Sequence, residues 1–257
     1  MDYFEKIEVQ KEDLTWNIPE TNQGSVNVIG GNSKHFKTEI KTTEFISKYP
    51  IKSLKLILPN SLKSQLPNLP NFTFLESTDS GSFANENELL DSFNSADYNL
   101  LLGDLSKNTI TEKAVAAACK NSEKPLLITR DSIDLIASHQ PEKVLMNENV
   151  TLMASMAQLQ KLFRAVYYPK MLLLSQSLIQ VAETLHKFTL SYPTKIITLH
   201  SDQILIAENG QVKAIQLAKT NYNALSFWQG EVAAKIVALN LYNPNNFINA
   251  TISAFFS

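Results

Sequence analysis

Glycine is scarce in this chain, which has 7 glycines among its 257 residues. At the usual glycine content of about 7%, a chain of this length would hold roughly 18. Loops that cradle phosphate groups generally need glycine, because their backbone N–H groups must approach the ligand closely. Whatever the protein binds, it has few such loops with which to bind it.

Cysteine and long apolar segments are also scarce, and neither sign of charge predominates. The single cysteine, Cys119, excludes an internal disulfide and is typical of a reducing cytosol, so we expect a cytoplasmic protein. The longest apolar stretches fall well short of the ~18 residues of a membrane span, and the charged N-terminus lacks the apolar core of a signal peptide. With 23 basic and 25 acidic residues and no run of Lys or Arg, neither nucleic acid nor an anionic membrane is expected as a partner.

Short apolar runs alternate with helical patterns along the whole chain, in which 44% of the residues are hydrophobic. Strands are expected at residues 26–29, 53–59, 72–77, 98–104, 124–131, 149–154, 195–201, 203–208 and 212–217. Helices are expected at residues 38–49, 87–93, 109–122, 132–138, 155–166, 171–188, 229–242 and 244–256. In the first of them, Ile40, Phe45 and Ile46 are the candidate inward positions. This alternation indicates βα units, and uninterrupted apolar strands are typical of a sheet buried on both faces. We therefore expect one α/β domain over residues 1–257, with a mostly parallel sheet and helices on both faces.

A glycine pair, Gly30-Gly31, closes the first of these strands in the stretch GSVNVIGGNSKHF, residues 24–36. Together with Asn32, the pair is a candidate for a ligand pocket at the C-terminal end of the strand, where open α/β sheets bind ligands. The alternative is a strand-to-helix turn that needs a positive φ. The pair matches neither the Rossmann nor the Walker fingerprint, so both interpretations stay open.

Six stretches follow one family pattern in order along nearly the whole chain. They are residues 11–36, 98–108, 126–136, 150–162, 196–212 and 228–241. Several residues in them match that pattern: Pro19, Gly24, Gly30, Gly31, Gly103, Leu105, Asp131, Thr151 and Gly230. In these residues the chain resembles the ribokinase-like superfamily, and most closely its ADP- or ATP-dependent NAD(P)H-hydrate dehydratases.

The departures from the pattern fall on the positions that carry chemistry. Residues of other types stand at Asp104, Ser106, Thr129, Leu152, Met153, Met156, His200, Ser201, Trp228, Gln229 and Glu231. Glu231 stands for the family's catalytic aspartate and is one methylene longer. Its carboxylate would therefore lie about 1 Å from the family position, and misplacement on that scale can cost ~10²-fold in rate.

The resemblance implies a three-layer α/β/α ribokinase-like fold with a nucleotide cleft at the C-terminal ends of the strands. It implies that this cleft binds ADP or ATP with Mg²⁺. It implies substrate binding by Gly30, Gly31, Asn32 and Asp131. It implies nucleotide binding by Gly103, His200, Gln229 and Gly230, with Glu231 as the base.

Structural alternatives stand beside these roles. Asp131 could cap the helix that follows it, His200 could be a structural histidine at a strand end, and Glu231 could simply favour a helix N-terminus. The remaining histidines share no metal-ligand spacing with one another or with Cys119, so no metal-ligating residues are predicted.

Three hypotheses for the function follow. The first is a divergent NAD(P)H-hydrate dehydratase-like enzyme, with a small-molecule kinase as a close variant. The second is a catalytically degenerate relative, a pseudoenzyme that binds a small-molecule ligand or a protein partner, including through a homo-oligomeric interface. The third is an unrelated α/β protein, which would lack the expected hairpin at residues 196–208 or would hold Gly30 and Gly230 on opposite sides of the sheet.

Overall fold

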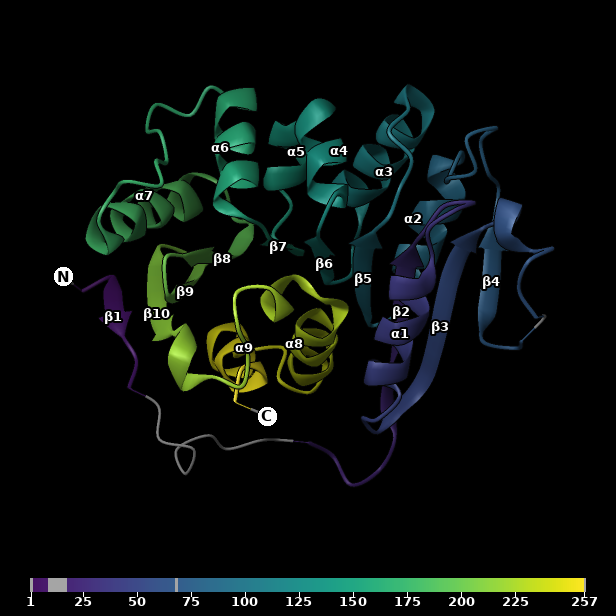
Figure 1. The fold of residues 1–257 in the computed structure, drawn as a ribbon, viewed down its shortest axis with the longest axis horizontal. Coiled ribbons are helices and arrows are strands. Elements are labelled where there is room, and N and C mark those ends of the chain that lie inside the picture. The colour runs from purple at the N-terminus through teal and green to yellow at the C-terminus, as the bar shows by residue number, and fades with distance from the viewer. Residues whose placement is uncertain (1, 9–17, 68, 257) are drawn as a thin grey trace.

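One sheet runs through the whole molecule (Figure 1). The computed structural model describes residues 2–8, 18–67 and 69–256, and within them ten strands form the sheet in the order β1-β10-β9-β8-β7-β6-β5-β2-β3-β4. The strands are β1 (Phe4–Lys6), β2 (Gln23–Gly30), β3 (Ile51–Pro59), β4 (Phe72–Leu75), β5 (Tyr98–Gly103), β6 (Leu126–Thr129), β7 (Val150–Met153), β8 (Lys195–His200), β9 (Gln203–Glu208) and β10 (Gln211–Gln216). Neighbouring strands are parallel except around β9, which runs antiparallel to both β8 and β10.

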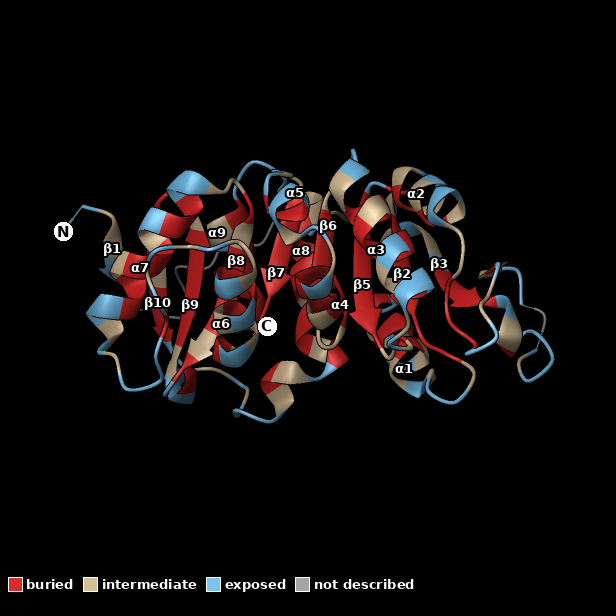
Figure 2. Ribbon diagram, turned by 90° about the horizontal axis from the view of Figure 1, so that it is seen from above, coloured by how far each residue is buried: buried red, intermediate tan, exposed pale blue. Residues whose placement is uncertain are grey.

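Helices cover both faces of this sheet. They are α1 (Lys37–Ile46), α2 (Glu86–Asn94), α3 (Thr109–Asn121), α4 (Ser132–Ser138), α5 (Pro141–Leu145), α6 (Met156–Ala165), α7 (Leu178–Ser191), α8 (Gly230–Tyr242) and α9 (Phe247–Ala254). Figure 1 shows α2 to α7 along one side of the sheet and α8 with α9 on the other, and α1 packs on α8. Each side has its own apolar core against strands that are buried along most of their length (Figure 2). The expected three-layer α/β/α architecture is confirmed.

The differences from the predicted elements have local causes. The strand β1 was not expected, because residues 2–8 are strongly charged; its backbone pairs in parallel with β10. The helix predicted at 171–188 starts only at Leu178, because Ser177 and Gln180 form a capping box that ends the preceding loop. Part of the matched stretch, residues 11–17, lies outside the described residues.

The helix α1 departs from its expected packing. Ile40 and Phe45 were predicted to point inward and are only half-buried, whereas Ile46 is buried as expected. The rest of the buried face is polar and consists of Glu39, Thr42 and Thr43. None of the helices among the described residues has the length and apolar character that crossing a lipid bilayer requires.

Candidate functional site

The strands β2, β5 and β6 end side by side, and their C-terminal loops form one edge of the sheet. Gly30 at the end of β2 pairs with Gly103 at the end of β5. The N–H of Gly31 donates to the carbonyl of Gly103 at 2.8 Å, and Gly31 has a φ of +86°, which favours glycine. Asn32 donates to the carbonyl of Asp104 and accepts from the N–H groups of the loop leading into α1. Gly30, Gly31 and Asn32 therefore build a tight, buried turn.

Asp131 organises the neighbouring loop after β5. Its carboxylate accepts from the N–H of Asp104 at 2.8 Å and from the N–H of Leu105 at 3.2 Å. A Cβ on Gly103 would overlap the same carboxylate, and Gly103 has a φ of +137°. Asp131 stands at the N-cap position of α4, but its carboxylate is bonded to the loop after β5 and makes no capping hydrogen bond to the helix.

Arg130 and Asp104 face each other across the ends of β6 and β5. Their side chains form an ion pair at 2.8 Å, and both are partly buried. Both backbones are left-handed, with φ values of +56° and +55°. A side chain in this conformation costs about 1–2 kcal/mol, so two strained residues lie at the same point of the sheet edge.

The polar face of α1 packs against this edge. The Glu39 carboxyl is fully buried, and a Cβ on Gly30 would lie 2.8 Å from its Oε1. Within the described part of the chain, no residue other than Glu39 itself gives either oxygen of this carboxyl a hydrogen-bond partner. Burial, and secondly the negative charge of Asp104, raises the pKa of Glu39 to about 8. The carboxyl is therefore largely protonated at neutral pH.

Thr42 lies one turn further along α1 and faces the start of α8. Its hydroxyl is buried and has no partner among the described residues. A Cβ on Gly230 would overlap this hydroxyl oxygen, so only glycine lets the first turn of α8 approach α1 so closely. Gln229 precedes α8, and its side chain makes no capping hydrogen bond to the first N–H groups of this helix.

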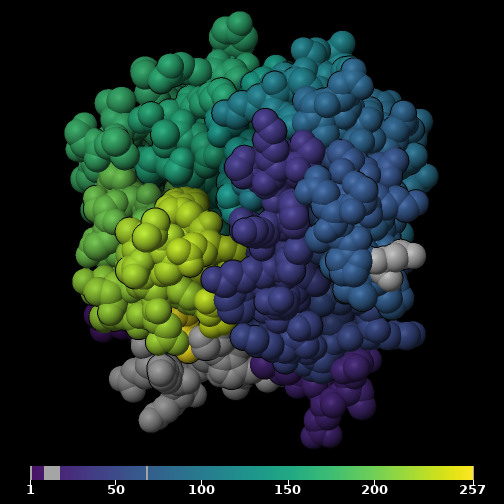
Figure 3. All heavy atoms as spheres, turned by 45° about the vertical axis from the view of Figure 1, so that its right-hand side comes forward, coloured from purple at the N-terminus to yellow at the C-terminus, as the bar shows by residue number. Residues whose placement is uncertain are grey.

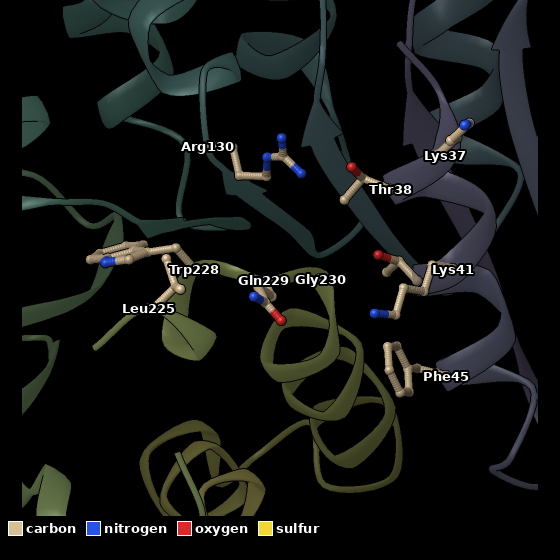
Figure 4. Close-up of a pocket in the computed structure, with 10 residues that line it drawn as sticks. Lys37, Thr38, Lys41, Phe45, Arg130, Leu225, Trp228, Gln229 and Gly230 are labelled. Atoms are coloured by element: carbon tan, nitrogen blue, oxygen red, sulfur yellow. The ribbon is translucent and has the colours of Figure 1, made fainter. Parts of the chain in front are cut away.

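A cleft of about 510 Å³ opens at this junction of α1, the end of β6 and the segment before α8. Figure 3 shows the purple segment with α1 lying beside the yellow-green segment with α8. The lining residues are Lys37, Thr38, Lys41, Thr42, Phe45, Arg130, Leu225, Trp228, Gln229 and Gly230. In Figure 4 Lys41 extends toward Gln229, and Arg130 extends toward Thr38. The lining holds three cations and no carboxylate, so the cleft suits an anion.

This architecture was compared with those of known proteins. No protein-family model matches the chain, and no curated protein is similar to it in sequence. Solved structures do match. A ribokinase-like superfamily protein from Enterococcus faecalis V583 is 15% identical with a TM-score of 0.69, over 99% of this chain and 85% of that one. The chain has the ribokinase-like fold.

Two further structures with this fold have named activities. The ADP/ATP-dependent NAD(P)H-hydrate dehydratase from Bacillus subtilis, co-crystallised with ATP/Mg²⁺, is 12% identical with a TM-score of 0.62, over 96% of this chain and 85% of that one. A hydroxyethylthiazole kinase from Pyrococcus horikoshii OT3 is 12% identical with a TM-score of 0.56, over 90% and 76% of the two chains. The hairpin expected of this fold is present as β8–β9. Gly30 and Gly230 both pack on α1, so among the described residues neither structural sign expected of an unrelated α/β protein is present.

The residues predicted for the ribokinase-like site separate into three groups. Gln229 and Gly230 line the cleft. Five others gather at the sheet edge behind it, where they hold the loops: Gly30, Gly31, Asn32, Gly103 and Asp131. Neither His200 nor Glu231 is among the lining residues.

These last two side chains have local partners. The Nε2 of His200 bonds to the carbonyl of Gln176 at 2.9 Å, and the Glu231 carboxylate pairs with Lys235 one turn along α8 at 3.4 Å. His200 is thus hydrogen-bonded at the end of β8, and Glu231 lies in the first turn of α8. These are the surroundings of a structural histidine and of an acid favoured at a helix N-terminus.

Sequence reasoning missed the basic residues of the cleft. Lys37 and Lys41 are four residues apart and so share one face of α1, a spacing visible in the sequence. Arg130 lies directly after the apolar run of β6, where a charged side chain reaches the edge of the sheet. Glu39 and Thr42 gave no signal, because only the facing glycines make room for polar groups inside the helix packing.

The ligands that the fold implies can be tested against these residues. Phosphate oxygens suit Lys41, Arg130, the Thr42 hydroxyl and the start of α8. A resident magnesium ion does not fit: among residues 2–8, 18–67 and 69–256 no group of three or more His, Cys, Asp or Glu could hold a metal. Mg²⁺ usually needs one or two carboxylates besides phosphate oxygens, and the cleft supplies none, so we derive no step through a metal.

Proposed function

We propose that this chain binds a phosphate-bearing small molecule of the ADP or ATP class in the cleft between α1 and α8. The observation that carries the proposal is the Thr42 hydroxyl, which is buried, unpartnered among the described residues and held against the start of α8. The uncapped N–H groups of α8 and the positive end of its dipole favour an anion at the same point.

The cleft supplies the charge and the surface that such a ligand needs. Lys37, Lys41 and Arg130 provide positive charge for phosphate oxygens, and Phe45 and Trp228 provide apolar surface for the rest of the molecule. The low glycine content agrees with this arrangement. Side-chain donors from α1 take the place that glycine-rich backbone would otherwise fill.

Calorimetric titration with ADP tests the proposal. Lys41→Ala and Thr42→Val should each weaken binding about tenfold, because each removes a donor to a charged oxygen. Val keeps the branched shape that packs on Gly230. Lys63→Ala, which removes an exposed lysine outside the cleft, is the matched control and should bind as the wild type does. Failure of the wild type to bind ADP, or equal binding by all four proteins, would contradict the proposal.

The second candidate function is catalysis, as a NAD(P)H-hydrate dehydratase-like lyase or a small-molecule kinase. Its support is the ribokinase-like fold shared with structures that carry those names. Glu231 would be the base, and its bond to Lys235 would have to open first. Because its carboxylate lies outside the cleft lining, the geometry favours binding without this chemistry, as in a pseudoenzyme. Turnover of hydrated NADH with ADP or ATP, lost in Glu231→Gln, would favour the enzyme.

A cytoplasmic location is part of the same proposal. The single cysteine, Cys119, is buried, and on the ground of this low cysteine content we propose a reducing cytoplasm as the setting. The proposed partner is a small molecule, and neither nucleic acid nor a membrane is needed.

A further inference from the structure

The buried carboxyl of Glu39 stands directly behind the wall of the cleft. Glu39 lies three residues before Thr42 on the same buried face of α1, and Thr42 lines the cleft. Apart from the backbone N–H of Glu39 itself, its two oxygens have no hydrogen-bond partner within the described residues, and no solvent reaches the side chain. Such a group is stable in its neutral form and senses the charges around it strongly, because little water screens them.

Three charged groups act on this carboxyl, and all come from the loops at the sheet edge. Asp104 after β5 and Asp131 after β6 raise the pKa of Glu39, while Arg130 after β6 lowers it. The strand β2 carries no charged residue, and its Gly30 meets the carboxyl. The strand β3 also packs on α1, and its two lysines, Lys52 and Lys55, are exposed to solvent.

The helices bring no further acid to this contact. On α8, the acid of the first turn is Glu231, which is paired with Lys235. The lysines of α1 itself, Lys37 and Lys41, lie on its exposed side. Arg130 is thus the cation whose state matters for Glu39.

Arg130 belongs to two sites at once. It forms the ion pair with Asp104 at 2.8 Å, and it also lines the cleft. An anion in the cleft would share or take its guanidinium, which has five N–H donors. In either case the ligand adds negative charge near Glu39 and offsets the one cation that favours its ionised form.

We propose that anion binding in the cleft is coupled to the proton on Glu39, so that the ligand binds the protonated form more tightly and affinity falls as pH rises. This inference rests on the proposed function of the cleft. The sign follows from linkage. Added negative charge favours the neutral acid, so the complex holds the Glu39 proton to a higher pH than the free protein does. Between those two points binding takes up protons, and above both the affinity has its lowest value.

Calorimetric titration with ADP at pH 7.2 and 9.2 tests this inference. Both pH values lie well above the second pKa of a phosphate group, about 6, so the charge of the ligand changes little between them. The dissociation constant of the wild type should rise about fivefold or more, the usual lower range of coupling between two sites. Repeating the titration near pH 8 in two buffers of different ionisation enthalpy should reveal net proton uptake.

Two variants separate Glu39 from other sources of pH dependence. Glu39→Gln keeps the shape without a titrating proton, and Glu39→Met fills the space with an apolar chain in case the amide is poorly tolerated. Either variant, once its folding is verified by circular dichroism, should bind ADP at pH 7.2 and lose most of the change at pH 9.2. Glu44→Gln, an exposed position on the same helix, should keep the full change.

The outcomes divide clearly. Wild-type binding that does not change with pH, or a change that persists in Glu39→Gln and Glu39→Met, would overturn the coupling while leaving the proposed function intact. Absence of ADP binding by the wild type at both pH values would overturn the proposed function and the coupling together.

Discussion

Thr42 and Gly230 pack so closely that the start of α8 is fixed by the hydroxyl of a threonine on α1. A Cβ on Gly230 would overlap Thr42 Oγ1 and lie 3.0 Å from Thr42 Cβ. Gly30 makes the corresponding contact with Glu39 one turn earlier on α1. The two glycines that resembled ligand-binding motifs in the sequence therefore also serve the packing of one helix, and the cleft lies where that packing leaves polar groups free.

Gly230→Ala should destabilise the protein by about 1–3 kcal/mol, because the added methyl group overpacks the contact with Thr42. The backbone of Gly230 does not have a positive φ, so the cost is steric. Chemical denaturation measures it, and Thr42→Ala provides the control. In that background the alanine at position 230 should cost clearly less. An equal cost in both backgrounds would mean that the two residues do not interact in this way.

The stability of the protein should depend on pH through Glu39. The pKa of this acid is about 8 in the folded protein and 4.5 in its ordinary state, so between these values the folded state holds the proton and the unfolded state releases it. The free energy of unfolding should therefore fall as pH rises through this window, by up to about 1.4 kcal/mol per pH unit.

Denaturation of the wild type and Glu39→Met at pH 5.5, 7 and 8.5 checks this prediction. The wild type should lose about 3–4 kcal/mol relative to the variant across that range. Parallel curves for the two proteins would show that Glu39 ionises in the folded protein at its ordinary pKa.

Asp131→Ala should cost about 2–4 kcal/mol, because it leaves the N–H groups of Asp104 and Leu105 without their acceptor. Asp131→Asn keeps one amide oxygen and should cost less. The matched control is Asp91→Ala, an exposed aspartate on α2, which should change stability by no more than about 0.5 kcal/mol. If Asp131→Ala proves as mild as the control, the loop after β5 is held by other contacts.

The sheet and most of its helices could be predicted because their signals are local. Apolar runs such as residues 98–103 mark strands, and the alternation with helices marks parallel pairing. The polar face of α1 could not be predicted. Periodicity assigns apolar residues to the inside, so it favours Ile40 and Phe45 over Glu39 and Thr42 as the buried residues of this helix. The decisive contacts join residues far apart in the chain, such as Thr42 with Gly230, and no local pattern reports them.

The site was predicted only in part, because local patterns do not report contacts between distant residues. Gln229 and Gly230 were found because the family pattern names them, and they line the cleft. Arg130 was missed because its role depends on a left-handed backbone at the end of β6 and on the ion pair with Asp104. Both are properties of the assembled sheet edge.

A crystal structure of the protein with ADP would show whether the cleft between α1 and α8 holds the phosphate groups of a nucleotide. We expect a phosphate group in the cleft, with oxygens within hydrogen-bond distance of the Thr42 hydroxyl and the first N–H groups of α8, and with Lys41 or Arg130 in contact. Nucleotide bound elsewhere, with the Thr42 hydroxyl still lacking a partner, would contradict this expectation.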